Sequence, residues 1–462
     1  MHGNARDRER RSGPPHLRLP VLGLFLTASF AAGACTSGPD TPSDAGGSQI
    51  PQPIVNDLAV APESERVDLD EPTFSDPTTI TNPLFPVSNQ ASVLLVGRVD
   101  GKAFRTEVTL LPDTRIIEWE GRQVETLVSQ YVAFLDGRIH EVAYDYYAQA
   151  DDGSVWYFGE DVFNFADGVI ADTHGTWIAG KDGPAAMIMP GDPQVGDVYR
   201  PENIPGFVFE EVTVRSIGQT LPGPLGPIEG GLVIEELHMD GITEDKSFAP
   251  GYGEFYTGGG GDEEALALAV PTDSLSGPAP TELVSLETGA ASAFEATRSG
   301  DWEAASAAVE EMTVAWQTYV AGGVPTLIEP RMSRALEALA RAVDARDASQ
   351  ASQAAIDTAL WSLDLQLRHR SPVRIDLARF DLWLAQLVVD AEAGDASAVN
   401  GDFFTLDYIR DRILSALDGA DVNRINMELE EIQGAVGDKD LAAAADAAVA
   451  LRATLSHLAP AS

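Results

Sequence analysis

Cysteine is almost absent from this sequence, since Cys35 is the single cysteine among 462 residues. A chain with one thiol forms no intrachain disulfide, and no second cysteine can act as a nucleophile. Basic residues are also scarce: 30 Lys and Arg stand against 72 Asp and Glu, which gives a formal net charge of -42. Because nucleic acids are bound through Lys and Arg contacts to phosphate, this balance excludes nucleic acid as a partner.

The N-terminal segment has the pattern of a lipoprotein signal peptide. An arginine-bearing stretch precedes the apolar run 21–34, which is too short to cross a bilayer but has the length of a secretory h-region. Small residues before the lone cysteine resemble the bacterial lipobox, in which a lipid is attached to the thiol. We predict a signal peptide at 1–34, lipidation of Cys35, and a location in the cell envelope, anchored to the membrane and facing outside the cytoplasm. The alternative is an ordinary secretory signal.

Composition divides the remaining chain into four parts. Residues 35–75 are rich in Pro, Gly, Ser and Asp, which predicts a flexible tether. A second such stretch, 257–280, contains a run of four glycines and predicts a linker. These boundaries leave a first domain at 76–256 and a second at 281–460, each large enough for its own core.

The two domains have different periodicities. Alternating or β-branched runs separated by Asp-Gly turns indicate an antiparallel β barrel or sandwich in the first domain. In the second, the pairs at 300–301, 346–347, 394–395 and 437–438 end in Asp and precede Ala-rich amphipathic stretches. Gly suits a helix C-cap and Asp a helix N-cap, so each period predicts a helical hairpin. Stacked hairpins form either a solenoid or a bundle. The fold class is therefore α+β with two domains.

The segment 141–162 concentrates acidic and aromatic side chains in one predicted hairpin. A two-residue turn at Asp152-Gly153 would place Asp145 opposite Glu160. A three-residue turn with a bulge would place Asp145 beside Gly159 instead. Either register leaves Asp145 with another acid nearby, and two opposed carboxylates repel unless a cation lies between them or one holds a proton.

Three interpretations of these acids remain open. They can be structural, accepting hydrogen bonds at the rim of packed aromatic rings. They can bind calcium or another hard cation through Asp145, Glu160 and Glu141, since carboxylate oxygens suit such ions. They can also form the acid pair of a glycosidase, with Asp145 and Glu160 as the two carboxyls. In the last two cases the aromatic residues of the hairpin would contact the ligand, namely Tyr147, Trp156 and Tyr157.

Several motifs of the first domain resemble a family of secreted and lipid-anchored bacterial proteins. They are the stretch 82–86 (NPLFP) and the hairpin pattern DxYAQ...DGxVWYFGED that begins at Asp145. The resemblance covers most of the first domain and none of the second, and it implies no activity. This sequence departs from the pattern at Phe209-Glu210-Glu211, where a small residue would precede the acidic pair.

Other catalytic signatures are lacking. There is no HExxH motif, no GxSxG elbow and no phosphate-binding Gly-rich loop with a Lys behind it. We therefore predict a non-catalytic binding or assembly protein of the cell envelope, whose helical domain serves a protein partner and whose only suggested cofactor is calcium. The alternative is a carbohydrate-active hydrolase that uses Asp145 and Glu160.

Overall fold

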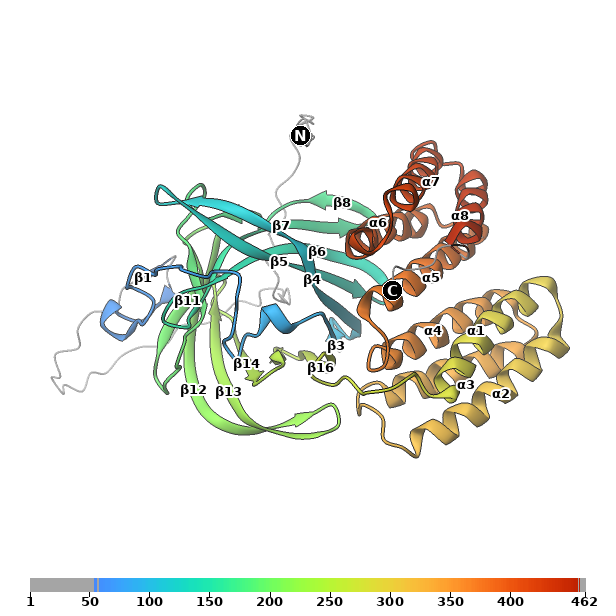
Figure 1. Ribbon diagram of the computed structural model, residues 1–462, viewed down its shortest axis with the longest axis horizontal. Coiled ribbons are helices and arrows are strands. Elements are labelled where there is room, and N and C mark those ends of the chain that lie inside the picture. Colours follow the sequence, from blue (N-terminus) through green and yellow to red (C-terminus); the bar gives the residue numbers. More distant parts are fainter. Residues whose placement is uncertain (1–53, 56–57, 456, 458–462) are drawn as a thin grey trace, which may run out of the picture.

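The computed structural model describes residues 54–55, 58–455 and 457. The predicted signal peptide, Cys35 and the first part of the predicted tether lie outside these residues. The described chain forms a 14-stranded antiparallel sheet followed by eight helices (Figure 1), which confirms the two-part α+β architecture. None of its helices combines the length and the apolar character that a membrane span requires.

The sheet is open, so the predicted closed barrel is not formed. Its hydrogen-bonded order is β10-β7-β6-β5-β4-β3-β16-β15-β14-β13-β12-β11, with β8 and β9 paired to β7, and no ladder between described residues joins β10 to β11. The strands are β3 (Ser92–Val99), β4 (Lys102–Trp119), β5 (Arg122–Leu135), β6 (Arg138–Gln149), β7 (Val155–Ala166), β8 (Val169–Asp172), β9 (Trp177–Ile178), β10 (Ala186–Met189), β11 (Val198–Ile204), β12 (Val208–Gly223), β13 (Gly226–His238), β14 (Thr243–Ala249), β15 (Gly253–Gly259) and β16 (Asp262–Val270). A separate two-stranded sheet pairs β1 (Ile54–Val55) with β2 (Leu58–Ala59).

The sheet separates two apolar environments, one on each face. On β3, Leu94 and Val96 join the core formed by the helices, whereas Val93 and Leu95 line a cavity inside the curled sheet. Side chains alternate between faces along a strand, so both faces of β3 are buried. This explains why its sequence, SVLLVGRV, is an almost continuous apolar run.

The predicted linker at 257–280 is wrong for its first half. Residues 257–259 belong to β15, and β16 pairs with β3 on one side and with β15 on the other. Of the four glycines that indicate a linker, the first two end β15, and Gly260 and Gly261 form the tight turn to β16 with φ values of 63° and 111°. Glycine adopts such angles without strain, so its abundance marks the turn and not a domain boundary.

The predicted tether is wrong for residues 58–75, which pack against the sheet. Val60 is fully buried, and Arg66 pairs with Val198 in an isolated bridge. The ring of Phe74 packs edge-on against Trp119 and Phe158, with centroid distances of 6.1 and 5.4 Å. A few side chains make these contacts, so a composition poor in large apolar residues did not reveal them.

The helices form two four-helix bundles, which selects the bundle over the solenoid. In the first, α1 contacts α2 and α4, and α3 contacts the same two helices; in the second, α5 contacts α6 and α8, and α7 contacts the same two. Their bounds are α1 (Thr281–Ser299), α2 (Trp302–Val320), α3 (Glu329–Ala345), α4 (Ala348–Gln366), α5 (Pro372–Ala393), α6 (Ala396–Ile413), α7 (Gly419–Gly437) and α8 (Leu441–Leu455). Short 3-10 turns occur at η1 (Glu63–Glu65), η2 (Val87–Asn89) and η3 (Leu414–Ala416).

The predicted helix caps are confirmed at three of the four breaks. Asp301, Asp347 and Asp395 each accept a hydrogen bond from the first turn of the next helix. The fourth break is displaced by two residues, because Lys439 takes the left-handed conformation with φ of 60° and Asp440 accepts from Ala443 N at 3.0 Å. The hairpin pattern therefore holds although the last boundary shifts.

A buried ionic network joins the helices to the outer face of the sheet. Arg412 on α6 donates to Glu107 on β4 at 2.7 Å, and Arg379 on α5 donates to Asp364 on α4 at 2.7 Å. Arg105 on β4 reaches the same Asp364 at 2.7 Å. Because these groups are at most 11% exposed in their side chains, the two parts of the chain share one desolvated interface.

Candidate functional site

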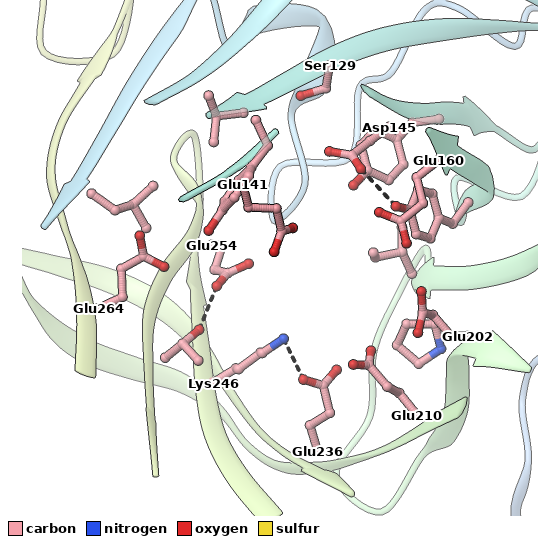
Figure 2. A pocket seen from close by; sticks show the side chains of 18 of the residues that line it. Ser129, Glu141, Asp145, Glu160, Glu202, Glu210, Glu236, Lys246, Glu254 and Glu264 are labelled. Carbon is pink, nitrogen blue, oxygen red and sulfur yellow. Dashed lines mark hydrogen bonds and ion pairs between the residues drawn. The ribbon is translucent and has the colours of Figure 1, made fainter. Parts of the chain in front are cut away.

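The curled sheet encloses a cavity of about 700 Å³. Its lining side chains come from β3 to β8, from β10 to β16, from the segment that precedes β3 and from the loop after β8, and none comes from α1 to α8. Figure 2 shows carboxyl groups pointing into this space from several sides. The cavity reaches the surface beside Ala171 and Asp172, which line it and are exposed. Nine of its lining residues are acidic: Glu141, Asp145, Glu160, Asp172, Glu202, Glu210, Glu236, Glu254 and Glu264.

The β6–β7 hairpin combines the two registers that the sequence allows. Near the turn, Tyr147 pairs with Tyr157, as expected for the longer turn with a bulge. Beyond a register shift, Asp145 pairs with Glu160, as expected for the two-residue turn. The shift occurs at Gly159, which has φ of 113° and lies so close to Trp177 that a Cβ atom would come within 2.1 Å of its carbonyl oxygen. The bulge therefore turns both acids toward the cavity.

Glu141 lies four residues before Asp145 on β6, so both side chains point to the same face of the sheet. Its side chain is buried, and its Oε1 atom has no hydrogen-bond partner among the described residues. Burial raises the pKa of Glu141 to about 8, and the charges of Asp145 and Asp172 add to the shift. A buried acceptor without a donor costs free energy, which a ligand that donates a hydrogen bond would recover.

Asp145 and Glu160 are held by neutral donors. Tyr157 donates its hydroxyl to Asp145 Oδ1 at 2.8 Å, and burial nevertheless raises the pKa of Asp145 to about 7. Burial also raises the pKa of Glu160, together with the charges of Glu202 and Asp145. The carboxyl of Glu202 on β11 shares a hydrogen bond with Glu160, so this contact joins the edge strand β11 to β7, the strand next to the other edge.

The aromatic residues of the hairpin divide between its two faces. Tyr147 and Tyr157 line the cavity, and their rings stack at a centroid distance of 4.9 Å. Trp156 does not line the cavity; it is buried in the surrounding core and donates from Nε1 to Ser154 Oγ at 2.8 Å. Of the three predicted ligand-contacting residues, the structure therefore places two at the cavity wall.

A second cluster, on β12, β13 and β14, was missed in the sequence. His238 Nδ1 lies 3.2 Å from Glu210 Oε1, and His238 Nε2 lies 3.5 Å from Glu244 Oε2. Lys246 forms an ion pair with Glu236. The histidines of the sequence are not spaced from other ligand residues as in known metal-site motifs. Strand pairing nevertheless brings residues 210, 236 and 244 together. The available signal was a charged or titratable residue at every second position, Glu236 and His238 on one strand and Glu244 and Lys246 on the next.

This cluster contains residue types that bind metal ions, but the charges of its acidic and basic groups already neutralise one another. Ligand atoms of Glu210, Glu236 and His238 all lie within 4.8 Å of one another, which makes them the only such group in the described chain. Burial would lower the pKa of His238, but hydrogen bonds with Glu210 and Glu244 raise it to about 10. A metal ion would have to displace that proton and compete with Lys246. The predicted calcium ligands, Glu141 with Asp145 and Glu160, do not form a group of this compactness.

Comparisons with known proteins leave the site to be interpreted from its own residues. No model of a protein family matches the chain, and no curated protein matches its sequence.

Two residues of the motifs that suggested a family resemblance have structural roles. Gln149 Oε1 accepts from the backbone nitrogens of Thr81 and Asn82 at 2.7 and 2.9 Å, and Asn82 Nδ2 donates to Gly153 O at 3.0 Å. These bonds fasten the segment before β3 to the hairpin turn.

Proposed function

We propose that this chain is a lipid-anchored binding protein of the bacterial cell envelope that holds a positively charged ligand inside its sheet without transforming it. The observation that carries the proposal is the acid-lined cavity, in which the buried Glu141 Oε1 has no hydrogen-bond partner among the described residues. Anchoring at Cys35 is supported by the N-terminal sequence pattern. The helical bundles, which lie outside the cavity wall, are available to a protein partner of an assembly (Figure 1).

A cationic ligand accounts for the protonation state of the cavity. Buried carboxyls with pKa values raised toward neutrality retain protons when nothing compensates their charge. A cation in the cavity would stabilise the ionised forms and release those protons. Calcium is one such cation, and an organic ammonium ion is another; the volume of about 700 Å³ accommodates the larger ligand.

The test is binding to the chain prepared without residues 1–34. Thermal melting is measured at pH 8 with calcium chloride, with an alkylammonium chloride and with a neutral sugar. A cation is expected to raise the melting temperature with its concentration, as for any ligand that binds only the native state. Glu141→Gln should weaken this rise, whereas Glu430→Gln, at an exposed position of α7, should leave it unchanged. If no cation changes the melting temperature, the proposal is wrong.

The second candidate is a carbohydrate-active hydrolase. The direct pairing of Asp145 with Glu160 favours it, because retaining glycosidases use two carboxyls about 5 Å apart. The raised pKa of Glu160 suits a general acid, but burial also raises that of Asp145, which would have to act as the ionised nucleophile. Hydrolysis of aryl glycosides that disappears in Asp145→Asn and Glu160→Gln would support this candidate over the binding protein.

A further inference from the structure

The charges at the cavity wall fall into two kinds. Around Lys246 and His238, basic and acidic groups neutralise one another. Elsewhere the carboxyls accept hydrogen bonds from neutral donors: Asp145 from Tyr157, Glu202 from Trp177, and Glu264 from Thr106. A neutral donor satisfies an oxygen atom but leaves the charge uncompensated. The charge of Lys246 also acts on Glu254 and Glu264, but burial still raises the pKa of Glu264 to about 8. These carboxyls are therefore the ones that a cationic ligand would neutralise.

The uncompensated carboxyls stand on opposite walls. Asp145, Glu160 and Glu202 lie on β6, β7 and β11, and the last of these is an edge strand of the sheet. Glu264 lies on β16 opposite Thr257 of β15, and Glu254 lies on β15, near enough for its charge to act on Glu264. Three strands separate the two groups along either path: β5, β4 and β3 in one direction, and β14, β13 and β12 in the other. Figure 2 shows Glu254 and Glu264 across the open space from Asp145, Glu160 and Glu202.

The wall between these two groups is mainly apolar on the side of β3, β4 and β5, where β3 contributes Val93 and Leu95 and β4 contributes Val108. The side of β12, β13 and β14 carries the charged cluster of Glu210, Glu236 and Lys246. Such a surface favours methylene groups, since their removal from water is favourable. The cavity therefore offers acceptors for positive charge at two ends and an apolar passage between them.

Two buried polar atoms that belong to neither group of carboxyls also point to a ligand. Glu141 Oε1 and the hydroxyl of Tyr199 both belong to lining residues that are at least nine-tenths buried, and neither atom has a hydrogen-bond partner in the described chain. Buried polar atoms are rarely left in this state. The tyrosine stands on β11 beside the first acidic wall, and Glu141 stands on β6 near the opening.

We infer that the ligand is a linear aliphatic amine with at least two ammonium groups, one bound by Asp145, Glu160 and Glu202 and the other by Glu264 and Glu254. This inference rests on the proposed function, because it specifies which cation the cavity holds. Each ammonium group donates three hydrogen bonds and accepts none, which matches carboxylate walls that only accept when ionised.

Binding is expected to release protons. Burial raises the pKa of Glu264 to about 8 and that of Asp145 to about 7, so both hold protons for part of the time at neutral pH in the free protein. An ammonium group beside each carboxyl would favour its ionised form. The affinity for the diamine should therefore increase between pH 6 and 8.5, with proton uptake by the buffer visible in calorimetry.

The experiment is isothermal titration calorimetry of the chain without residues 1–34, at pH 8, with three four-carbon probes. Butane-1,4-diamine should bind roughly ten- to hundredfold more tightly than butylamine, since the second charge adds a charge-assisted contact. Butane-1,4-diol should not bind. Glu264→Gln should bring the diamine close to the affinity of butylamine and leave butylamine almost unchanged, whereas Glu430→Gln should affect neither.

The possible outcomes separate this inference from the proposed function. Equal affinities for butylamine and the diamine would overturn the two-ended ligand while the cation-binding proposal stands. Binding of calcium but of no amine would have the same meaning. Binding of the diol as tightly as the diamine, or of none of the probes together with no effect of calcium, would overturn both. Because the three probes are compared on the unaltered protein, the result does not depend on how well a variant folds.

Discussion

Arg412 Nη1 on α6 lies 2.7 Å from Glu107 Oε2 on β4, and both side chains are at most 4% exposed. Burial would raise the pKa of Glu107, but the charges of Arg379, Arg105 and Arg412 hold it well below its ordinary value. The carboxylate therefore stays ionised between sheet and helices. The helical bundles and the sheet are consequently coupled through charged groups that are buried on both sides of their interface.

Removing one charge from this network should destabilise both parts of the chain together. Glu107→Gln leaves three arginines with one carboxylate fewer, and breaking a buried pair costs about 3–5 kcal/mol. Melting followed by circular dichroism should show sheet and helix signals falling in one transition at a lower temperature. Glu229→Gln, in the hairpin of β12 and β13, should have little effect since Glu229 is exposed. Two separate transitions would show that the parts unfold independently.

Stability should fall as pH rises from about 5 to 8. The native pKa of Glu141 and that of Glu264 are about 8, above the ordinary value of 4.5, so the native state binds more protons than the unfolded state in this range. The stabilisation is complete below pH 4.5 and is lost as the pH passes through 8. Urea unfolding at several pH values should show the loss, on the order of a few kcal/mol.

Glu141→Gln provides the control for this pH dependence. The amide has nearly the same shape and does not titrate, so the slope of unfolding free energy against pH should become shallower. An unchanged slope would show that Glu141 does not supply the linkage.

The bulge in β7 should not tolerate a side chain. Gly159→Ala would place a Cβ atom 2.1 Å from Trp177 O and impose a φ of 113° on alanine. We expect a loss of about 2 kcal/mol or more in unfolding free energy, together with weaker cation binding. Gly121→Ala is the matched control, because it also has positive φ but meets no atom within 4 Å. Equal losses for both variants would leave only the backbone angle as the cause.

Lipidation of Cys35 is tested in cells rather than in the structure. Growth with an alkyne analogue of palmitate should label the wild-type chain, and Cys35→Ala should remove the label because no other thiol exists. The variant should also leave the membrane fraction. Labelling of both forms would contradict the anchor.

The sequence predicted the type of secondary structure in each part of the chain better than the boundaries between the parts. Period-two runs and Asp-cap spacing identified the sheet and the helical hairpins, because both signals are local. The opposition of Asp145 and Glu160 was also within reach, since it depends on one short turn. By contrast, the glycines at 258–261 were read as a linker although they make a turn between paired strands.

The second half of the site could not be found in the same way. His238 and Glu244 are sequence neighbours whose contact depends on how β13 pairs with β14, and Glu210 joins them only through β12. The approach of Glu202 to Glu160 depends on the curl of the whole sheet, which brings β11 near β7. Such relationships arise from the packing of the entire chain, and no local spacing encodes them.

The position of β16 between β3 and β15 determines when the sheet can be completed during synthesis of the chain. A chain that leaves a ribosome or a membrane channel N-terminus first exposes β3 with one bare edge, and Val93 finds its ladder partner Ala269 only 176 residues later. Bare strand edges attract other chains, so the nascent sheet is at risk of aggregation until β16 arrives. The first helix begins at Thr281, soon after that strand, and the apolar face of β3 that it helps to cover stays exposed for the same interval. Chaperones that shield such edges would therefore determine how much of this protein reaches its folded state.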